Sequence, residues 1–116
     1  MDSRERILRE NVTEYLEYAE RALQEKKYNS AVTLFFKAIC AAADLFLLLK
    51  EGLVPSSHTH RFRIMEEKYK EIYTILDKDF PFYQDSYTQK MNQEAAEVLQ
   101  EDAHRITKMS QSWKKR

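Results

Sequence analysis

Apolar side chains recur every three or four residues in four stretches of the chain, with polar and charged residues between them. Because an α-helix turns once in about 3.6 residues, this spacing gathers the apolar side chains on one face of a helix. The pattern therefore predicts four amphipathic helices, over residues 4–26, 29–51, 60–77 and 87–112.

The second of these predicted helices has the widest apolar surface. From Ala38 to Leu49 almost every position is apolar, and the one charged residue is Asp44. Such a helix is central in its own fold, or it faces both its own core and a partner. A buried carboxylate is unfavourable unless it is paired. We therefore expect Asp44 either to lie on a thin exposed strip or to meet a cation or a hydroxyl group.

Residues that are typical of helix ends limit the first two helices. Asp2 or Ser3 can cap the start of the first helix, and Asn29 or Ser30 can cap the start of the second. Gly52 is the only Gly in the chain, and it follows the second helix at the position of a C-terminal cap.

The second half of the chain contains a loop and a further helix start. The predicted loop covers residues 78–85 and is broken by Pro81. Three aromatic residues of this loop are expected to plug the end of the bundle: Phe80, Phe82 and Tyr83. Ser86 followed by Gln89 has the form of a capping box for the last helix. The apolar face of that helix is expected to end at Trp113.

Four amphipathic helices joined by short loops place sequence neighbours antiparallel to one another. The fold class that we predict is all-α, an up-and-down four-helix bundle that leaves room for a short fifth helix. A single domain over residues 1–116 suits this length. The composition agrees, because one Gly and two Pro are too few for a sheet protein with many tight turns.

Charge and cysteine usage exclude several classes of function. The 19 Lys and Arg residues balance the 19 Asp and Glu residues, so phosphate binding would require a local patch. The single Cys40 excludes an internal disulfide and Cys-based zinc sites, and its apolar neighbours indicate an inert buried thiol. The N-terminus lacks the apolar core of a secretory signal, and the run 38–49 is too short to span a bilayer. We therefore expect a cytoplasmic protein with no membrane segment.

The densest polar chemistry lies in the segment 58–63, which contains two His and two Arg residues. Free N–H groups at a helix start favour an anion, and nearby cations strengthen that preference. The segment is therefore a candidate site for a nucleotide or RNA phosphate, through His58, His60, Arg61 and Arg63. The alternative is a solvated helix start in which one His caps locally. Two His ligands without a third do not predict a metal site, and we predict no catalytic residue and no cofactor.

The order of the remaining features carries a resemblance. A charged first helix leads to an alanine-rich helix over Tyr28–Leu45, then to a loop with His, to Tyr87 and to the helical segment Glu94–Ile106. This order resembles the HEPN domain family of small prokaryotic helical proteins, and the likeness runs from about Asn11 to Met109. It implies a four- or five-helix up-and-down bundle, usually a homodimer, often paired with a small nucleotidyltransferase as in toxin–antitoxin systems.

The family's nuclease motif is absent from this chain. Nuclease members carry Arg, four to six residues, then His, near the start of the last long helix, and two copies act together on the RNA phosphate and 2′-hydroxyl. The corresponding segment here, Phe82–Lys90, contains neither Arg nor His, and no Arg precedes a His at that spacing elsewhere. No catalytic residue is therefore carried over from the family.

These observations predict a non-catalytic HEPN-like binding module. It would form a homodimer or dock a small nucleotidyltransferase, and it would bind nucleotide or RNA through the segment 58–63. One alternative is a divergent HEPN ribonuclease that uses other residues. Another is a helical protein-interaction adaptor, because the run Tyr28–Ala38 is similar to tetratricopeptide helix pairs, although a second copy of the run is lacking.

Overall fold

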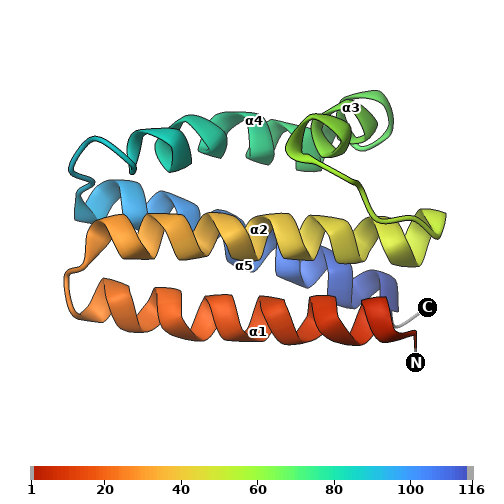
Figure 1. Ribbon diagram of the computed structural model, residues 1–116, viewed down its shortest axis with the longest axis horizontal. Coiled ribbons are helices and arrows are strands. Elements are labelled where there is room, and N and C mark those ends of the chain that lie inside the picture. Colours follow the sequence, from red (N-terminus) through yellow and green to blue (C-terminus); the bar gives the residue numbers. More distant parts are fainter. Residues whose placement is uncertain (1, 115–116) are drawn as a thin grey trace.

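The computed structural model describes the backbone of residues 2–114 and the side chains of residues 2–111. Within this range the protein is an all-α globule without strands, as predicted (Figure 1). The Trp113 side chain, which was expected to end the apolar face of the last helix, lies outside the described residues. It has five helices: α1 Ser3–Gln24, α2 Tyr28–Glu51, α3 His58–Lys68, α4 Lys70–Asp85 and α5 Gln93–Lys114.

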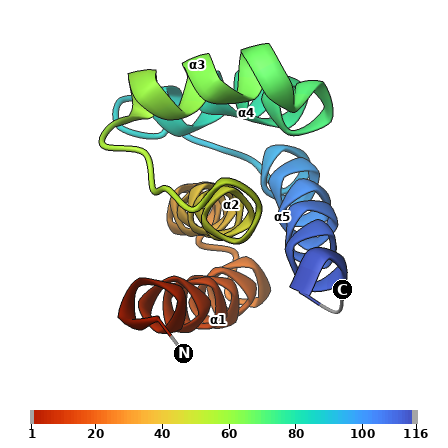
Figure 2. The ribbon, with the colours of Figure 1, turned by 90° about the vertical axis from the view of Figure 1, so that its right-hand side faces the viewer.

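Helix α2 is the centre of the fold. Seen end-on, it has α1 on one side, α5 on a second and the α3–α4 pair on a third (Figure 2). The helices α1, α2, α4 and α5 run in alternating directions along the long axis of a molecule measuring 37 × 26 × 21 Å. Fifteen of the 24 residues of α2 are buried, which agrees with its apolar pattern. Its small side chains, such as Ala31, Ala38 and Ala42, let its neighbours approach closely.

By length and composition alone, α2 is also apolar enough to cross a membrane. However, 78% of its most apolar stretch is buried by the other helices. The core helix of a globular fold passes the same test, so this property is explained by the packing of α2 in the bundle.

The first two helices end close to the predicted positions. Asp2 caps α1 by accepting a hydrogen bond from the backbone N–H of Arg4, and Gly52 ends α2 in the left-handed conformation with φ 77°. The predicted caps of α2 are wrong, because α2 begins at Tyr28 without a side-chain cap. Asn29 instead binds the chain before α5: its Nδ2 donates to the carbonyls of Ser86 and Gln89 at 2.9 and 2.7 Å.

The third predicted helix, over residues 60–77, is in fact divided between α3 and α4 at Tyr69. This residue has φ −135° and ψ 74°, outside the helical region. The reason is tertiary, since the Tyr69 hydroxyl donates to Glu51 and its ring packs edge-on against Phe46 at 5.0 Å. Both partners belong to the end of α2, which holds the joint between α3 and α4 in place.

The predicted loop over residues 78–85 is wrong, because α4 continues through Pro81 to Asp85. Pro81 lacks an N–H, so it leaves one carbonyl of the preceding turn without its helical donor. Packing offsets this loss: the rings of Phe80 and Tyr83 lie 5.8 and 4.8 Å from the ring of Phe36. Phe80 and Tyr83 therefore pack against α2 from within a helix, and do not plug the end of the bundle from a loop as expected.

The start of the last helix also differs from the prediction. Helix α5 begins at Gln93, and the Asn92 side chain accepts from the N–H of Ala95 at 2.8 Å. Ser86 does not form a capping box, because its hydroxyl donates back to the Tyr83 carbonyl at 2.6 Å. Tyr87 is 73% exposed.

Candidate functional site

The candidate site is organised around Arg61, which points into the protein. Its Nε and Nη2 donate to the two carboxylate oxygens of Asp44 at 2.7 and 2.9 Å, and Nη1 lies 2.8 Å from Nδ1 of His58. Arg61 comes from α3 and Asp44 from α2, so this bidentate ion pair joins the two helices. Asp44 thus meets a cation, which is the second of the two arrangements expected for it.

Burial makes this ion pair a tight one. Arg61 is 8% exposed and Asp44 is 7% exposed. Burial alone would lower the pKa of Arg61, but the hydrogen bonds that it donates to Asp44 and the negative charge of that carboxylate act together to hold the pKa above the ordinary value. The guanidinium therefore stays charged and stays with Asp44. Because of this pairing, Arg61 positions α3 against α2 and does not contact a phosphate directly.

His58 opens α3 and lies against aromatic rings. Its ring centroid is 5.7 Å from that of Phe80 and 6.3 Å from that of Phe36. Loss of solvent around the ring lowers the pKa of His58, and the charges of Arg61 and Lys37 lower it further. The imidazole is therefore neutral at neutral pH. Because Arg61 donates to Nδ1, the imidazole proton is assigned to Nε2.

The other two residues of the predicted cluster lie apart from this ion pair. His60 is half-buried, and its Nδ1 accepts from the N–H of Ser56 at 3.1 Å. This contact is local, as in the alternative of a solvated helix start, but the residue that caps α3 is Ser57, whose hydroxyl accepts from the N–H of His60. Arg63 is exposed, and it lines a surface hollow of about 490 Å³ between α3 and α4. The four residues therefore do not converge on one point.

The hollow beside Arg63 has mixed charge. Its lining includes His58 and Arg63, but also the carboxylates of Glu66 and Asp77. Two carboxylates oppose a bound anion at this short range. Phosphate binding in the hollow would therefore depend on contacts with Arg63 and His58 that keep the anion away from those carboxylates.

Sequence reasoning missed a second group of polar residues beside His58. The Nζ atom of Lys37 lies 5.9 Å from the ring centroid of Tyr83, and the hydroxyls of Tyr83 and Tyr87 are 3.0 Å apart. The hydrogen bond with the Tyr87 hydroxyl, together with burial, raises the pKa of Tyr83 to about 12. The sequence could have identified this group, because Lys37 is a charged residue among the apolar neighbours of α2.

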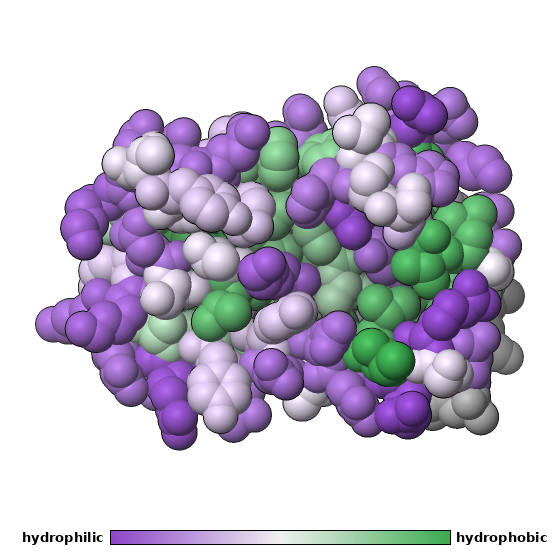
Figure 3. Space-filling model, in the orientation of Figure 1, coloured by the Kyte–Doolittle hydropathy of each residue, from purple (hydrophilic) through white to green (hydrophobic). Residues whose placement is uncertain are grey.

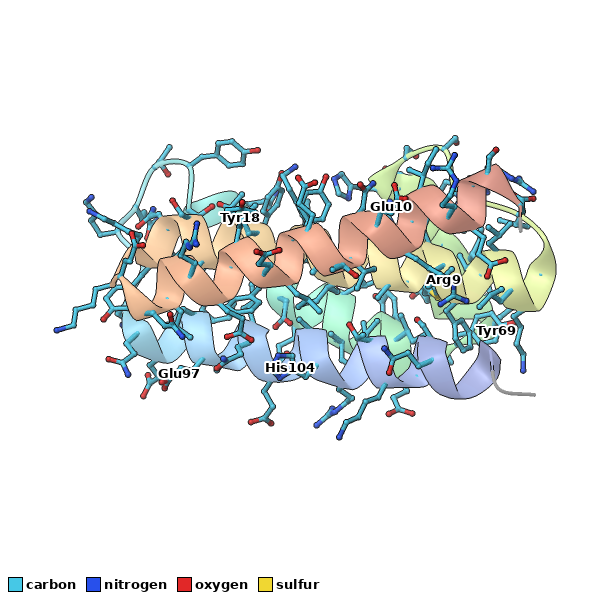
Figure 4. All side chains as sticks on the ribbon, turned by 90° about the horizontal axis from the view of Figure 1, so that it is seen from below. Arg9, Glu10, Tyr18, Tyr69, Glu97 and His104 are labelled. Atoms are coloured by element: carbon cyan, nitrogen blue, oxygen red, sulfur yellow. The ribbon has the colours of Figure 1, made fainter. Side chains whose placement is uncertain are left out.

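Cys40 and His104, whose side chains could carry chemistry, do not join the site. Burial raises the pKa of the Cys40 thiol to about 12, so Cys40 is protonated and inert, as predicted. His104 lies on α5 and contacts α1, where its Nε2 is 2.9 Å from a carboxylate oxygen of Glu20 (Figure 4). Among the described residues no group of three or more His, Cys, Asp or Glu residues could hold a metal ion.

Comparisons with known proteins give no relative for this site. No protein-family model, no curated protein and no solved structure matches the chain.

Proposed function

We propose that this chain is a cytoplasmic, non-catalytic HEPN-like binding module with an up-and-down bundle fold. It forms a homodimer, or it docks a small nucleotidyltransferase as in toxin–antitoxin systems. The alternating helix directions and the central apolar α2 support the fold (Figure 1). The absence of an Arg-x4–6-His motif supports a role without catalysis.

Exposed apolar side chains on α1 carry the interaction part of this proposal. Ile7 is 48% exposed and Tyr18 is 46% exposed on an otherwise charged helix. They stand eleven residues apart, which is about three helical turns, so they share one face of α1. Tyr18 and Glu10 lie on the side of α1 away from α5, whereas Arg9 points toward α5 (Figure 4). In Figure 3, apolar residues gather along the middle of this face, over α2 and beside α1, and hydrophilic groups separate them.

The double substitution Ile7→Glu with Tyr18→Glu tests this surface. The wild-type protein is expected to sediment as a dimer and the double variant as a monomer. Each buried apolar side chain contributes about 1.5–3 kcal/mol, so the dimer dissociation constant should rise at least ~100-fold. Sedimentation equilibrium over a range of protein concentrations measures the change.

Tyr87→Glu is the matched control, because Tyr87 is exposed but lies on the loop after α4. It should leave the dimer intact. A wild-type monomer, or dissociation caused equally by the control, would contradict the homodimer. Co-purification of a small nucleotidyltransferase that is lost in the double variant would make that protein the occupant of this face.

Nucleotide or RNA binding is the second candidate function, and the positive charge around His58 favours it. Lys37 acts on the His58 imidazole, the charge of Arg61 is paired with Asp44, and Arg63 is exposed five residues further along α3. A phosphate held between His58 and Arg63 would gain charge-assisted hydrogen bonds. His60 and Arg61 then act indirectly, because they bind Ser56 and Asp44 and do not contact the phosphate.

A titration with ATP and with short RNA tests this candidate. Arg63→Ala should weaken binding about tenfold or more, because hydrogen bonds to charged groups contribute roughly 1.5–3 kcal/mol. Arg21→Ala removes an exposed cation from α1 and serves as the control. Lack of saturable binding, or equal affinity in both variants, would refute the nucleotide site. RNA cleavage that His58→Ala abolishes would instead support a divergent ribonuclease.

A further inference from the structure

Two buried carboxyl groups face each other between α4 and α5. Asp79 on α4 is 0% exposed and Asp102 on α5 is 2% exposed. As ionised groups they have no hydrogen to donate to each other, and neither oxygen of Asp79 has another hydrogen-bond partner among the described residues. A fully buried carboxylate without a donor is strongly unfavourable, so the site requires a positive charge or a proton.

The cation that contacts this site favours Asp102 as the ionised member. Nζ of Lys78 lies 2.9 Å from Oδ2 of Asp102. This contact raises the pKa of Lys78 and keeps the ammonium group charged, while the positive charge of Arg105 lowers that pKa. The neighbouring part of α2 carries Lys37 and Asp44. Their charges act on His58 and Arg61, and not on the Asp79–Asp102 site.

Asp79 is then the member that carries the proton. Burial is the largest effect on this carboxyl group, and the hydrogen bond to Asp102 and the negative charge of Asp102 add to it. Together they raise the pKa of Asp79 to about 8, although the charge of Lys78 lowers it. A protonated Asp79 supplies the hydrogen bond that two carboxylates lack.

We propose that Asp79 and Asp102 share one proton across the contact between α4 and α5, and that loss of this proton to solvent at alkaline pH loosens α4 from α5. Once the proton has left, two buried carboxylates remain with the charge of Lys78 on Asp102 to offset them, and their repulsion acts directly across the contact. Helix α4 makes fewer contacts with α5 than with α2 or α3. The contact with α5 is therefore the side of α4 that opens first.

The direction of the pH dependence follows from linkage. An unfolded Asp ionises near its ordinary pKa of 3.8, whereas folded Asp79 keeps its proton until about pH 8. The stabilisation contributed by this proton is therefore fully present below the unfolded pKa and is lost as the pH rises through the folded one. Alkaline pH, and not acid, should release α4.

Hydrogen exchange on the full chain tests the proposal. After correction for intrinsic rates, the α4 amides of the wild-type protein should exchange at least ~10-fold faster at about pH 9 than at about pH 6, relative to those of α1. Asp79→Asn keeps the shape, supplies an N–H donor and cannot ionise, so it should abolish this difference. Asp77→Asn is the matched control on the same helix, since Asp77 is exposed, and it should behave like the wild type.

Asp102→Asn and a direct titration show whether the proton is shared with Asp102 or is held by the burial of Asp79 alone. Without the negative charge of Asp102, the midpoint of the α4 response should move to lower pH. In the wild type, carbon NMR should show one Asp carboxyl group with a midpoint near the value for Asp79, whether or not any variant folds. An unchanged midpoint in Asp102→Asn, the absence of such a carboxyl group, or a response that survives Asp79→Asn would overturn the proposal.

Discussion

Arg61→Ala is expected to lower the free energy of unfolding by about 3–5 kcal/mol, because it leaves a buried carboxylate without its cation. Asp44 is 7% exposed, and both of its oxygens accept hydrogen bonds from Arg61. Truncating Arg61 removes these bonds and leaves a cavity beside Asp44. Urea denaturation at neutral pH, followed by circular dichroism, measures the loss.

Two further variants identify the ion pair as the cause. Arg63→Ala removes an exposed cation two residues away and should change stability by less than about 0.5 kcal/mol. The double variant Asp44→Leu with Arg61→Met replaces the pair by apolar side chains and should recover most of the loss. A loss in Arg61→Ala no larger than that in Arg63→Ala, or no recovery in the double variant, would contradict this explanation.

Phe36→Ala is expected to lower the free energy of unfolding by about 3–5 kcal/mol, as for other large buried aromatic side chains. Phe36 is 1% exposed and stacks on Tyr83 at 4.8 Å, with Phe80 at 5.8 Å. These contacts hold α4 against α2, so the loss should be concentrated there. Thermal and denaturant unfolding measure the stability, and hydrogen exchange locates the weakened segment.

Tyr87→Ala is the comparison variant for Phe36→Ala. Its ring packs edge-on against Tyr83 at 5.6 Å but is 73% exposed, so its removal should cost less than about 1 kcal/mol. If Phe36→Ala destabilises α1 as strongly as α4, then Phe36 supports the whole core rather than the α2–α4 contact.

The helical pattern alone predicted most of the fold. Intervals of three and four residues gave the faces of α1 and α2, and Gly52 marked the end of α2. The errors fall where tertiary contacts outweigh local signals. Nothing in the local sequence breaks a helix at Tyr69, and its bond to Glu51 spans 18 residues. Pro81 suggested a loop, but the aromatic residues around it keep α4 helical.

The polar interior was predictable in part. Asp44 and Arg61 were each singled out, but 17 residues separate them and only the fold shows that they pair. Asp79 was missed because the predicted loop began at Lys78. Extending the apolar face of Ile72, Ile75 and Leu76 by one turn would have placed Asp79 among buried residues.

The central place of α2 has a consequence for synthesis on the ribosome. Helix α1 emerges before α2 and covers one side of it at once, whereas the sides that meet α4 and α5 stay open until later residues have been made. During that interval the growing chain exposes a helix that is long and apolar enough to enter a membrane. We therefore expect membranes and chaperones that bind apolar segments to compete with folding until α5 arrives.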